Sequence, residues 1–489
     1  MPEINQRRRE NRGLVHRRGL TLTGLRLARR RRRVNRSEPA SVLRKRGPPF
    51  IWLLAASWLM ACGAESRPSD SAQQSQSPET PTAVSVSVPV PTAAASPAAS
   101  PAAKATQALV LSLARFPVFQ PGKPPVPFPA ALEFLVPSEQ GMWEVVAIED
   151  PQSNVFHKAM SFPEQSGEAR LLTVSGSEAT VKTWKNRDGD LVATHVWQQD
   201  FGGRSSRIRD VEIADLYGDG RQALAVATHD QGVVAILRPT ADGGFSAEEI
   251  DRQPDTFVHE IEIGDLDGDG VPEVYATPSE PNRLDGSKQK GTVVRYVPAK
   301  GEGRFVVADL GRRHAKEILV DDIDGDGRDE LYVAIEGEID KRTQQLEKQV
   351  EIRRYEADTA PTAGILVAKI PDRFVRFLTV GDIEGDGRKE MVVAGFVSGL
   401  WLLRPQSGGA WKIESIDRNS GGFEHASILA DLDEDGRDEL YVASDTEKLV
   451  RRYEWDGKRL VGRVIRRRKE PGDVFTWNLM PVPIGLVPR

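Results

Sequence analysis

Five short stretches of the chain place carboxylates at alternate positions beside glycines. They begin at Asp215, Asp265, Asp322, Asp382 and Asp431, and the stretch at 322–327 reads Asp-Ile-Asp-Gly-Asp-Gly. Side-chain oxygens at this spacing, with a glycine that permits a sharp turn, suit a hard cation such as calcium. We therefore expect cation-binding loops in which calcium has a structural role and pins the chain between two strands.

The five stretches lie 50, 57, 60 and 49 positions apart, which indicates one repeated structural unit. In each unit an alternating segment such as 261–264 leads into the acidic loop, and β-rich segments such as 330–334, 292–297 and 305–308 follow. Four antiparallel strands in a unit of this length are typical of a propeller blade. The sequence therefore predicts an all-β fold, a β-propeller of four-stranded blades with calcium-binding loops between strands one and two.

Two weaker copies precede the acidic loops. Segments 170–175 and 179–184 read as strands two and three of one blade, and 132–136 and 143–148 read as strands two and three of another. The last segment, 475–480, could complete the first blade and close the ring, which would remove exposed strand edges. We expect seven blades, and six or eight remain open.

The repeats resemble the FG-GAP/VCBS repeats of integrin α-subunit propellers and of many bacterial surface proteins, over about residues 107–489. The resemblance implies that loop positions one, three, five and nine bind calcium through side chains and position seven through its carbonyl oxygen. About four structural Ca²⁺ sites follow, with these ligands: Asp265, Asp267, Asp269, Val271 and Glu273; Asp322, Asp324, Asp326, Arg328 and Glu330; Asp382, Glu384, Asp386, Arg388 and Glu390; Asp431, Asp433, Asp435, Arg437 and Glu439.

The first loop departs most from this pattern. Tyr217 stands at its third position and Ala223 at its ninth, so we do not expect it to bind an ion. An EF-hand is excluded, because the closing glutamate of the other four loops falls at position nine and strands, not helices, are expected to flank every loop. Acidic turns without any ion remain an alternative, since Asp and Gly are ordinary turn residues.

The amino terminus predicts export. Residues 1–41 form a basic leader of doubtful status, and 42–62 resemble a bacterial lipoprotein signal peptide with a lipobox that ends at Cys62. Lipidation of Cys62 would anchor the chain in a membrane of the bacterial cell envelope, facing the periplasm or the surface. The Pro-, Ala- and Ser-rich residues 63–106 are expected to be a disordered tether. A chance cysteine beside an ordinary signal peptide is the alternative.

Charge excludes nucleic acid as a partner. Residues 1–62 hold 16 Lys and Arg, and without them the chain has 50 basic and 68 acidic residues. A mature chain this acidic would be repelled by phosphate backbones.

One candidate ligand site lies about six positions before the acidic loops, where several innermost strands should begin. The basic or histidine residues there are His157, Arg209, His259, Lys316, Arg376 and His425, and Trp477 holds a similar place. Such a ring at one mouth of the channel could bind an anionic ligand. The alternative is that these polar residues line the channel and bond to neighbouring blades. Long connections at 280–291 and 336–350 are expected on the same face.

The sequence carries no catalytic motif, so we expect a binding protein and not an enzyme. The predicted function is a monomeric, membrane-anchored propeller that binds a glycan or a protein. Alternatives are a polysaccharide lyase, in which His259 or Lys316 would act as base, and an envelope assembly scaffold.

Overall fold

A computed structural model describes residues 105–489 except 118–127, 139–140, 164–166, 177, 203–205, 230, 279–289, 341 and 471. The predicted leader, signal peptide, Cys62 and nearly all of the tether lie outside these residues. Among the residues described, no helix has the length and apolar character to span a bilayer.

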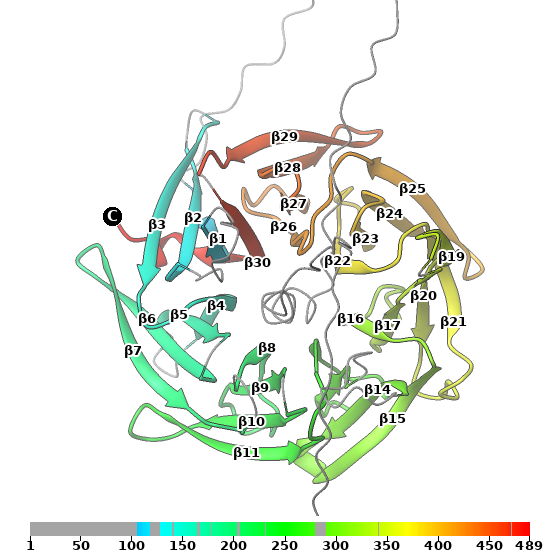
Figure 1. Ribbon diagram of the computed structural model, residues 1–489, viewed down its shortest axis with the longest axis horizontal. Helices are drawn as coiled ribbons and strands as arrows, with labels where there is room; N and C mark the ends of the chain where they lie inside the picture. Colours follow the sequence, from blue (N-terminus) through cyan, green and yellow to red (C-terminus); the bar gives the residue numbers. More distant parts are fainter. Residues whose placement is uncertain are drawn as a thin grey trace, which may run out of the picture. The chain divides into compact units, whose positions relative to one another are not determined.

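The described chain forms seven four-stranded antiparallel sheets around one axis (Figure 1). They are numbered here as blades 1 to 7, with strands given from innermost to outermost. Blade 1 contains β30 (Asp473–Pro483), β1 (Gln107–Phe116), β2 (Ala130–Pro137) and β3 (Trp143–Asp150). Blade 2 contains β4 (Phe156–Pro163), β5 (Ala169–Ser175), β6 (Thr180–Arg187) and β7 (Asp190–Gln198). Blade 3 contains β8 (Ile208–Ala214), β9 (Ala223–Thr228), β10 (Val234–Pro239) and β11 (Phe245–Asp251). Blade 4 contains β12 (Ile261–Gly264), β13 (Glu273–Ala276), β14 (Gly291–Val297) and β15 (Glu302–Gly311).

The remaining blades follow the same plan. Blade 5 contains β16 (Ala315–Asp321), β17 (Glu330–Ile335), β20 (Val350–Tyr355) and β21 (Ile365–Ile370). Blade 6 contains β22 (Val375–Gly381), β23 (Glu390–Gly395), β24 (Leu400–Pro405) and β25 (Trp411–Asp417). Blade 7 contains β26 (Ser427–Ala430), β27 (Glu439–Ser444), β28 (Leu449–Trp455) and β29 (Leu460–Arg467). Two short 3₁₀ helices, η1 (Pro298–Lys300) and η2 (Ile484–Leu486), and the hairpin β18 (Glu338–Ile339) and β19 (Leu346–Lys348) complete the elements.

The prediction of a seven-bladed, all-β propeller is confirmed, and so is its closure by the last strand. Strand β30 pairs with β1 along its whole length, from Gln107 opposite Pro483 to Phe116 opposite Asp473. One blade is therefore built from both ends of the described chain. Because the innermost strands of neighbouring blades contact one another all round the ring, unfolding one blade would open the whole ring.

The prediction for blade 1 was one strand out of register. Segments 132–136 and 143–148 are its third and fourth strands, not its second and third. The second strand is β1, whose apolar run Leu109–Leu113 was not recognised because no acidic loop precedes it.

Seven apolar clusters, one at each blade-to-blade interface, form the core. The interface of blades 2 and 3, for example, packs Leu172 and Val181 against Ile208 and Leu224. Second strands such as β17 are buried along their whole length, because both of their faces meet a neighbouring blade. Outermost strands such as β11 are largely exposed.

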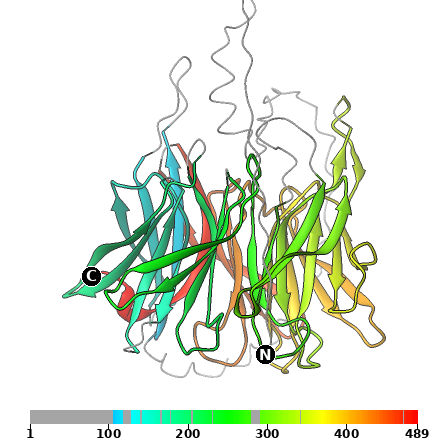
Figure 2. The ribbon, with the colours of Figure 1, turned by 90° about the horizontal axis from the view of Figure 1, so that it is seen from below.

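The two faces of the ring differ. Innermost strands begin on what we call the top face and end on the bottom face, where the acidic loops lie. The β17–β20 connection runs over the top face and contains the β18–β19 hairpin, which projects upward in Figure 2. The other long connection predicted there falls mostly within 279–289, outside the described residues.

Candidate functional site

Five acidic loops connect the innermost strand to the second strand in blades 3 to 7. They cover residues 215–223, 265–273, 322–330, 382–390 and 431–439, and are named here by their blades. Each begins where an innermost strand ends and finishes at the first residue of a buried second strand. The loops are therefore fixed at both ends by the core.

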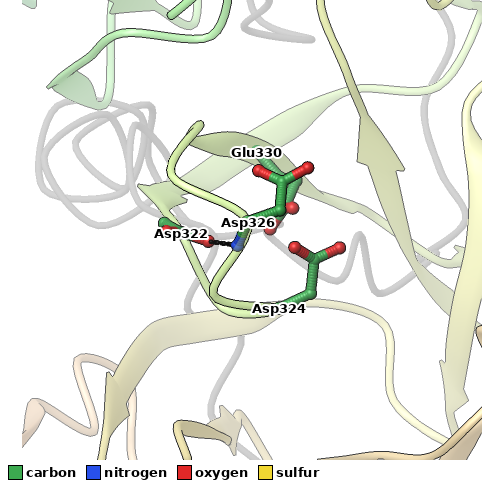
Figure 3. Close-up of side chains that lie close together, drawn as sticks. All are labelled: Asp322, Asp324, Asp326 and Glu330. Carbon is green, nitrogen blue, oxygen red and sulfur yellow. Dashed lines mark hydrogen bonds between the residues drawn. The ribbon is translucent and has the colours of Figure 1, made fainter.

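The first aspartate organises each loop through the backbone. In the blade 5 loop, Asp322 Oδ1 accepts the N–H groups of Gly325 (2.7 Å) and Asp326 (3.0 Å; dashed line in Figure 3), while its Oδ2 accepts that of Gly327 (2.9 Å). The sixth residue is a glycine at positive φ in all five loops. This turn folds the chain around the first carboxylate, so that the later carboxylates point back toward it.

The seventh residues, predicted to offer carbonyl oxygens, also close the turn. Their backbone N–H groups donate to the carboxylate of the fifth residue at 2.9–3.1 Å in the loops of blades 4 to 7: Val271, Arg328, Arg388 and Arg437. One oxygen of the fifth carboxylate is thereby held in place.

The closing glutamate is held by a tyrosine that the sequence analysis missed. Glu330 Oε2 accepts the N–H of Ile323 (3.3 Å) and the hydroxyl of Tyr332 (3.0 Å). Burial raises the pKa of Glu330 to about 7. The same pairing joins Tyr275 to Glu273 and Tyr441 to Glu439. The signal was present in the sequence as Glu-x-Tyr in blades 4, 5 and 7, whereas blades 3 and 6 lack it.

The loops differ in how closely their carboxylates gather. In blade 5, ligand oxygens of Asp322, Asp324, Asp326 and Glu330 all lie within 4.8 Å of one another (Figure 3). In blades 4 and 7 only the three aspartates gather: Asp265, Asp267 and Asp269, and Asp431, Asp433 and Asp435. Hard oxygen donors gathered around one point fit calcium, and they fit it best in blade 5.

The blade 6 loop was predicted to bind calcium, but its carboxylates form no such group within the described chain. Arg404 of β24 pairs with Glu384 (2.9 Å) and approaches Glu390 (3.8 Å). Glu384 stands where the loops of blades 4, 5 and 7 have an aspartate. Burial raises the pKa of Glu390 to about 7. A metal site in blade 6 stays a prediction.

The blade 3 loop holds an arginine among its acidic groups. Arg238 of β10 lies over the ring of Tyr217, with its guanidinium carbon 4.1 Å from the ring centroid. It also donates to Asp219 (2.6 Å), as does Arg221 at 2.5 Å. These hydrogen bonds, led by that from Arg221, lower the pKa of Asp219 to about 2. A guanidinium thus neutralises the loop whose third and ninth positions lack carboxylates.

Neighbouring loops are also joined to each other. Asp329 in the blade 5 loop accepts the N–H of Asp265 in the blade 4 loop (2.7 Å), and Asp438 does the same for Asp382 (2.7 Å). Gly264 directly precedes Asp265, the donor of the first of these bonds. A Cβ there would lie 2.1 Å from Val320 Cγ1 and 2.8 Å from Asp329 Oδ2, so only glycine fits. The loops of blades 4 and 5, and those of blades 6 and 7, are thus joined in pairs on the bottom face.

The six residues predicted to ring the top mouth do lie where the innermost strands begin, but they are not uniformly cationic. His157, His259 and His425 are buried, which lowers their pKa, that of His425 to about 4. His157 Nδ1 contacts the carbonyl of Ile208 at 2.6 Å, and His425 Nδ1 that of Gly395 at 2.6 Å. These contacts of His157 and His425 join neighbouring blades.

Two of the three permanent cations of the ring have acidic partners. Arg376 pairs with Glu424 (2.5 Å), and Lys316 approaches Glu336 (3.9 Å). Arg209 lies over the indole of Trp477, 5.1 Å from the ring centroid. The ring residues therefore connect neighbouring blades through hydrogen bonds and ion pairs. They leave less capacity to bind an anion than their residue types suggested.

Next to this ring, buried carboxylates gather on the innermost strands of blades 3 to 5. Lys158 of blade 2 pairs with Asp210 (3.0 Å) and with Glu212, while Glu317 accepts the N–H of Leu378 (2.7 Å). Burial raises the pKa of Glu317 to about 8 and those of Glu260 and Glu262 well above their ordinary value. The pKa of Lys158 is raised. Burial alone would lower this pKa, but the nearby carboxylates of Asp210 and Glu212 have the larger combined effect.

The top face of blade 6 carries an aromatic patch, not predicted from the sequence. The ring of Phe374, which is buried (7% exposed), stacks at 4.4 Å on the half-buried ring of Phe396, and Arg373 lies over them at 4.8 and 5.9 Å. The adjoining Val397 is 65% exposed. Buried Asp372 accepts the N–H groups of Val397 and Ser398 (both 2.8 Å), which fixes the turn that presents this patch.

Comparison with known proteins identifies the repeat. Residues 215–276, from the blade 3 loop to the second strand of blade 4, match the FG-GAP-like repeat family. A search of curated proteins gave no match.

Several solved structures are similar to the chain at low identity. Two are proteins of Bacteroides fragilis and Bacteroides uniformis, provisionally assigned as 6-phosphogluconolactonases, at 13% and 12% identity. Their alignments cover 78% and 77% of this chain and all of theirs, with TM-scores of 0.44 and 0.47. The Dos1 propeller matches at 9% identity over 69% of this chain and 82% of its own, with a TM-score of 0.42. At these scores, none carries an argument about activity.

Proposed function

We propose that this seven-bladed propeller with FG-GAP-like repeats is a calcium-stabilised binding protein, anchored in a bacterial envelope through Cys62, that captures a protein partner on its top face. The observation that carries the proposal is the blade 6 patch of Arg373, Phe374, Phe396 and Val397. Arginine and aromatic side chains dominate the energetics of protein interfaces. An exposed valine beside a stacked arginine offers both apolar area and a positive charge.

The patch is suited to binding because it is rigid. Asp372 holds the turn from below, and the stacked rings limit the rotamers of Arg373. Arg373 is half-buried, and its guanidinium can meet a carboxylate of the partner. A preorganised patch loses little side-chain entropy on association.

Calcium in this proposal braces the opposite face. The ligands would be the aspartates of the loops in blades 4, 5 and 7 with their closing glutamates. Bound calcium would neutralise carboxylates that otherwise repel one another and would join the innermost strand to the second strand. The ion has no part in contacting the partner, since the loops and the patch lie on opposite faces.

The test is site-specific photo-crosslinking of the full-length protein in the cells that make it. A crosslinking residue at 397 should capture one defined partner, and Arg373→Ala should abolish that product. The matched control has the crosslinking residue in place of Val464, which is 45% exposed on outermost strand β29. It should give no crosslinked product that is also formed from position 397. Equal products from both positions, or a specific glycan ligand that Arg373→Ala leaves bound, would contradict a protein partner at the patch.

The anchor is tested separately. Cys62→Ser should move the full-length protein from the membrane fraction to the soluble fraction without changing its crosslinked partner. If the protein stays in the membrane fraction, lipidation at Cys62 is not the anchor.

We do not extend the proposal to a polysaccharide lyase. His259, the histidine considered as a base, is 3% exposed and packs against His229 and Phe257. A base that abstracts a proton from a polymer must reach it within hydrogen-bond distance. The burial of His259 therefore favours a structural role.

A further inference from the structure

The third strand of every loop-bearing blade contributes one arginine to the loop region. These arginines are Arg238, Arg295, Arg354, Arg404 and Arg452. Each lies on the same side of its blade as the closing position of the loop, and each has at least one acidic group within 3.3 Å. The five blades can therefore be compared with one another, because they share the same strands and loop and differ in the contacts of this arginine.

In blades 4 and 7 the arginine bonds the glutamate that a calcium ion would need. Arg295 donates to Glu273 Oε1 at 2.7 Å, and Arg452 lies 2.8 Å from Glu439 Oε1 and 2.6 Å from Asp433. The other oxygen of each glutamate already accepts the hydroxyl of its tyrosine. Arginine and calcium therefore compete for Oε1.

In blade 5 the arginine leaves that oxygen alone. Arg354 pairs with Glu356 of the same strand end at 2.7 Å and reaches only Asp324, at 3.3 Å. Among the described residues no ion pair joins Arg354 to Glu330. This is also the one loop of the described chain in which the glutamate joins the three aspartates within 4.8 Å. The position of the arginine and the completeness of the acidic group vary together.

We propose that the third-strand arginines are internal counter-ions that set the order in which the loops take calcium. Blade 5 loads first, because its four carboxylates are already gathered. Blades 4 and 7 load later, because the ion must displace Arg295 or Arg452 from the glutamate. Blade 3 does not load, because Arg238 serves in place of the ion. This inference rests on the calcium role given under Proposed function.

The displaced arginines have a second position available. Arg452 lies 3.2 Å from Glu454, and Arg295 lies 3.5 Å from Glu302, both outside the ligand set. Arg354 already makes the corresponding contact with Glu356. The blade 5 arrangement is thus the arrangement that the other two blades would adopt on binding calcium.

Calcium titration of the full-length protein by calorimetry tests the order. Asp326→Asn should remove the tightest binding step, whereas Asp435→Asn, the same position in the blade 7 loop, should leave it in place. Arg452→Met should tighten a weaker step by about tenfold or more, since a charge-assisted bond no longer competes. Arg354→Met should change the tightest step by less than about threefold.

One control variant separates competition from simple loss of positive charge. Lys458→Met removes a charge from the same blade as Arg452, at an exposed side chain between β28 and β29, and it should change no step appreciably. If Arg452→Met does not fold, as judged by its thermal melt, the comparison of Asp326→Asn with Asp435→Asn still decides the order.

The outcomes distinguish the two proposals. If no variant and no wild-type protein binds calcium, both the calcium role and this inference fail. If calcium binds, but Asp435→Asn removes the tightest step, or Arg452→Met tightens nothing, the inference alone is overturned.

Discussion

The blade 5 loop and the innermost strands of blades 3 to 5 both gather carboxylates, but they satisfy them in different ways. In the loop, four carboxylates from nine consecutive residues converge at the surface, and backbone N–H groups hold the first of them. On the innermost strands, Asp210 and Glu212 of blade 3 meet Lys158 of blade 2, and Glu317 of blade 5 meets a backbone N–H of blade 6.

The difference teaches that acidic residues alone do not define a metal site. A loop folded around its own first carboxylate keeps the other oxygens directed at one point that an ion can reach from solvent. Burial raises the pKa of Glu317, and Lys158 pairs with Asp210 and Glu212. The first group has the open arrangement that the proposed calcium role requires, and the second joins blades.

The largest expected effect concerns the inner group. Lys158→Met should destabilise the full-length protein by about 3–5 kcal/mol, because it leaves Asp210 and Glu212 buried without a cation. Denaturant unfolding measures this. Lys185→Met in the same blade is the matched control, because Lys185 pairs with Glu168 at an exposed site and should change the unfolding midpoint little. Equal effects of the two substitutions would refute the distinction between buried and exposed pairs.

Calcium should act on the loops and not on the inner group. At a free calcium concentration 100 times the Kd, one site stabilises the folded state by about 2.7 kcal/mol. Asp326→Asn in blade 5 should remove most of this gain, whereas Asp219→Asn in blade 3 and Glu317→Gln should keep it. Thermal melts with calcium and with chelator give the comparison. An identical melt in both conditions would exclude a stabilising ion.

The bonded pair of loops in blades 4 and 5 predicts an intermediate effect. Gly264→Ala would place a methyl group 2.1 Å from Val320 Cγ1 and close to Asp329, so strand β12 or the blade 5 loop must shift. We expect a loss of about 1–3 kcal/mol. Gly303→Ala in the same blade has open space around its Cβ and is the control. A wild-type melting temperature for Gly264→Ala would show that the loops are not tightly joined.

The pH dependence of stability should report on the inner group. Because the folded pKa of Glu317 is raised to about 8 from an ordinary 4.5, its stabilising contribution is complete below pH 4.5 and is lost as pH rises through 8. Between pH 7 and pH 9 this amounts to about 1–2 kcal/mol. The buried histidines titrate below this window, so they do not obscure it.

Glu317→Gln checks that assignment. Glutamine keeps an oxygen for the N–H of Leu378 but cannot ionise, so the loss between pH 7 and pH 9 should shrink. Unfolding midpoints at the two pH values measure it. An unchanged slope would mean that Glu317 is ionised in the folded protein at neutral pH.

The repeat period and the glycine-paced aspartates were sufficient to predict the fold and the loops, because both are local patterns. The arginines that differentiate the loops could not be predicted in the same way. Arg354 and Arg452 share one register, opposite Tyr332 and Tyr441, yet Arg452 reaches Glu439 whereas Arg354 pairs with Glu356. This difference in side-chain contacts is visible only in the structure. The inner carboxylates were missed for a related reason: their partners belong to the next blade, some 50 residues away.

The smallest expected effect lies in the blade 7 loop. Glu434 holds the fourth position at φ 57, in the left-handed region, where the other four loops have glycine. Glu434→Gly should stabilise the protein by at most about 1 kcal/mol, because relief of this strain is partly offset by the greater freedom of glycine in the unfolded chain. Gly325→Ala at the equivalent position of blade 5 should destabilise it by a similar amount. If both substitutions are destabilising, the blade 7 turn depends on the Glu434 side chain, which accepts a hydrogen bond from Thr106, more than on backbone strain.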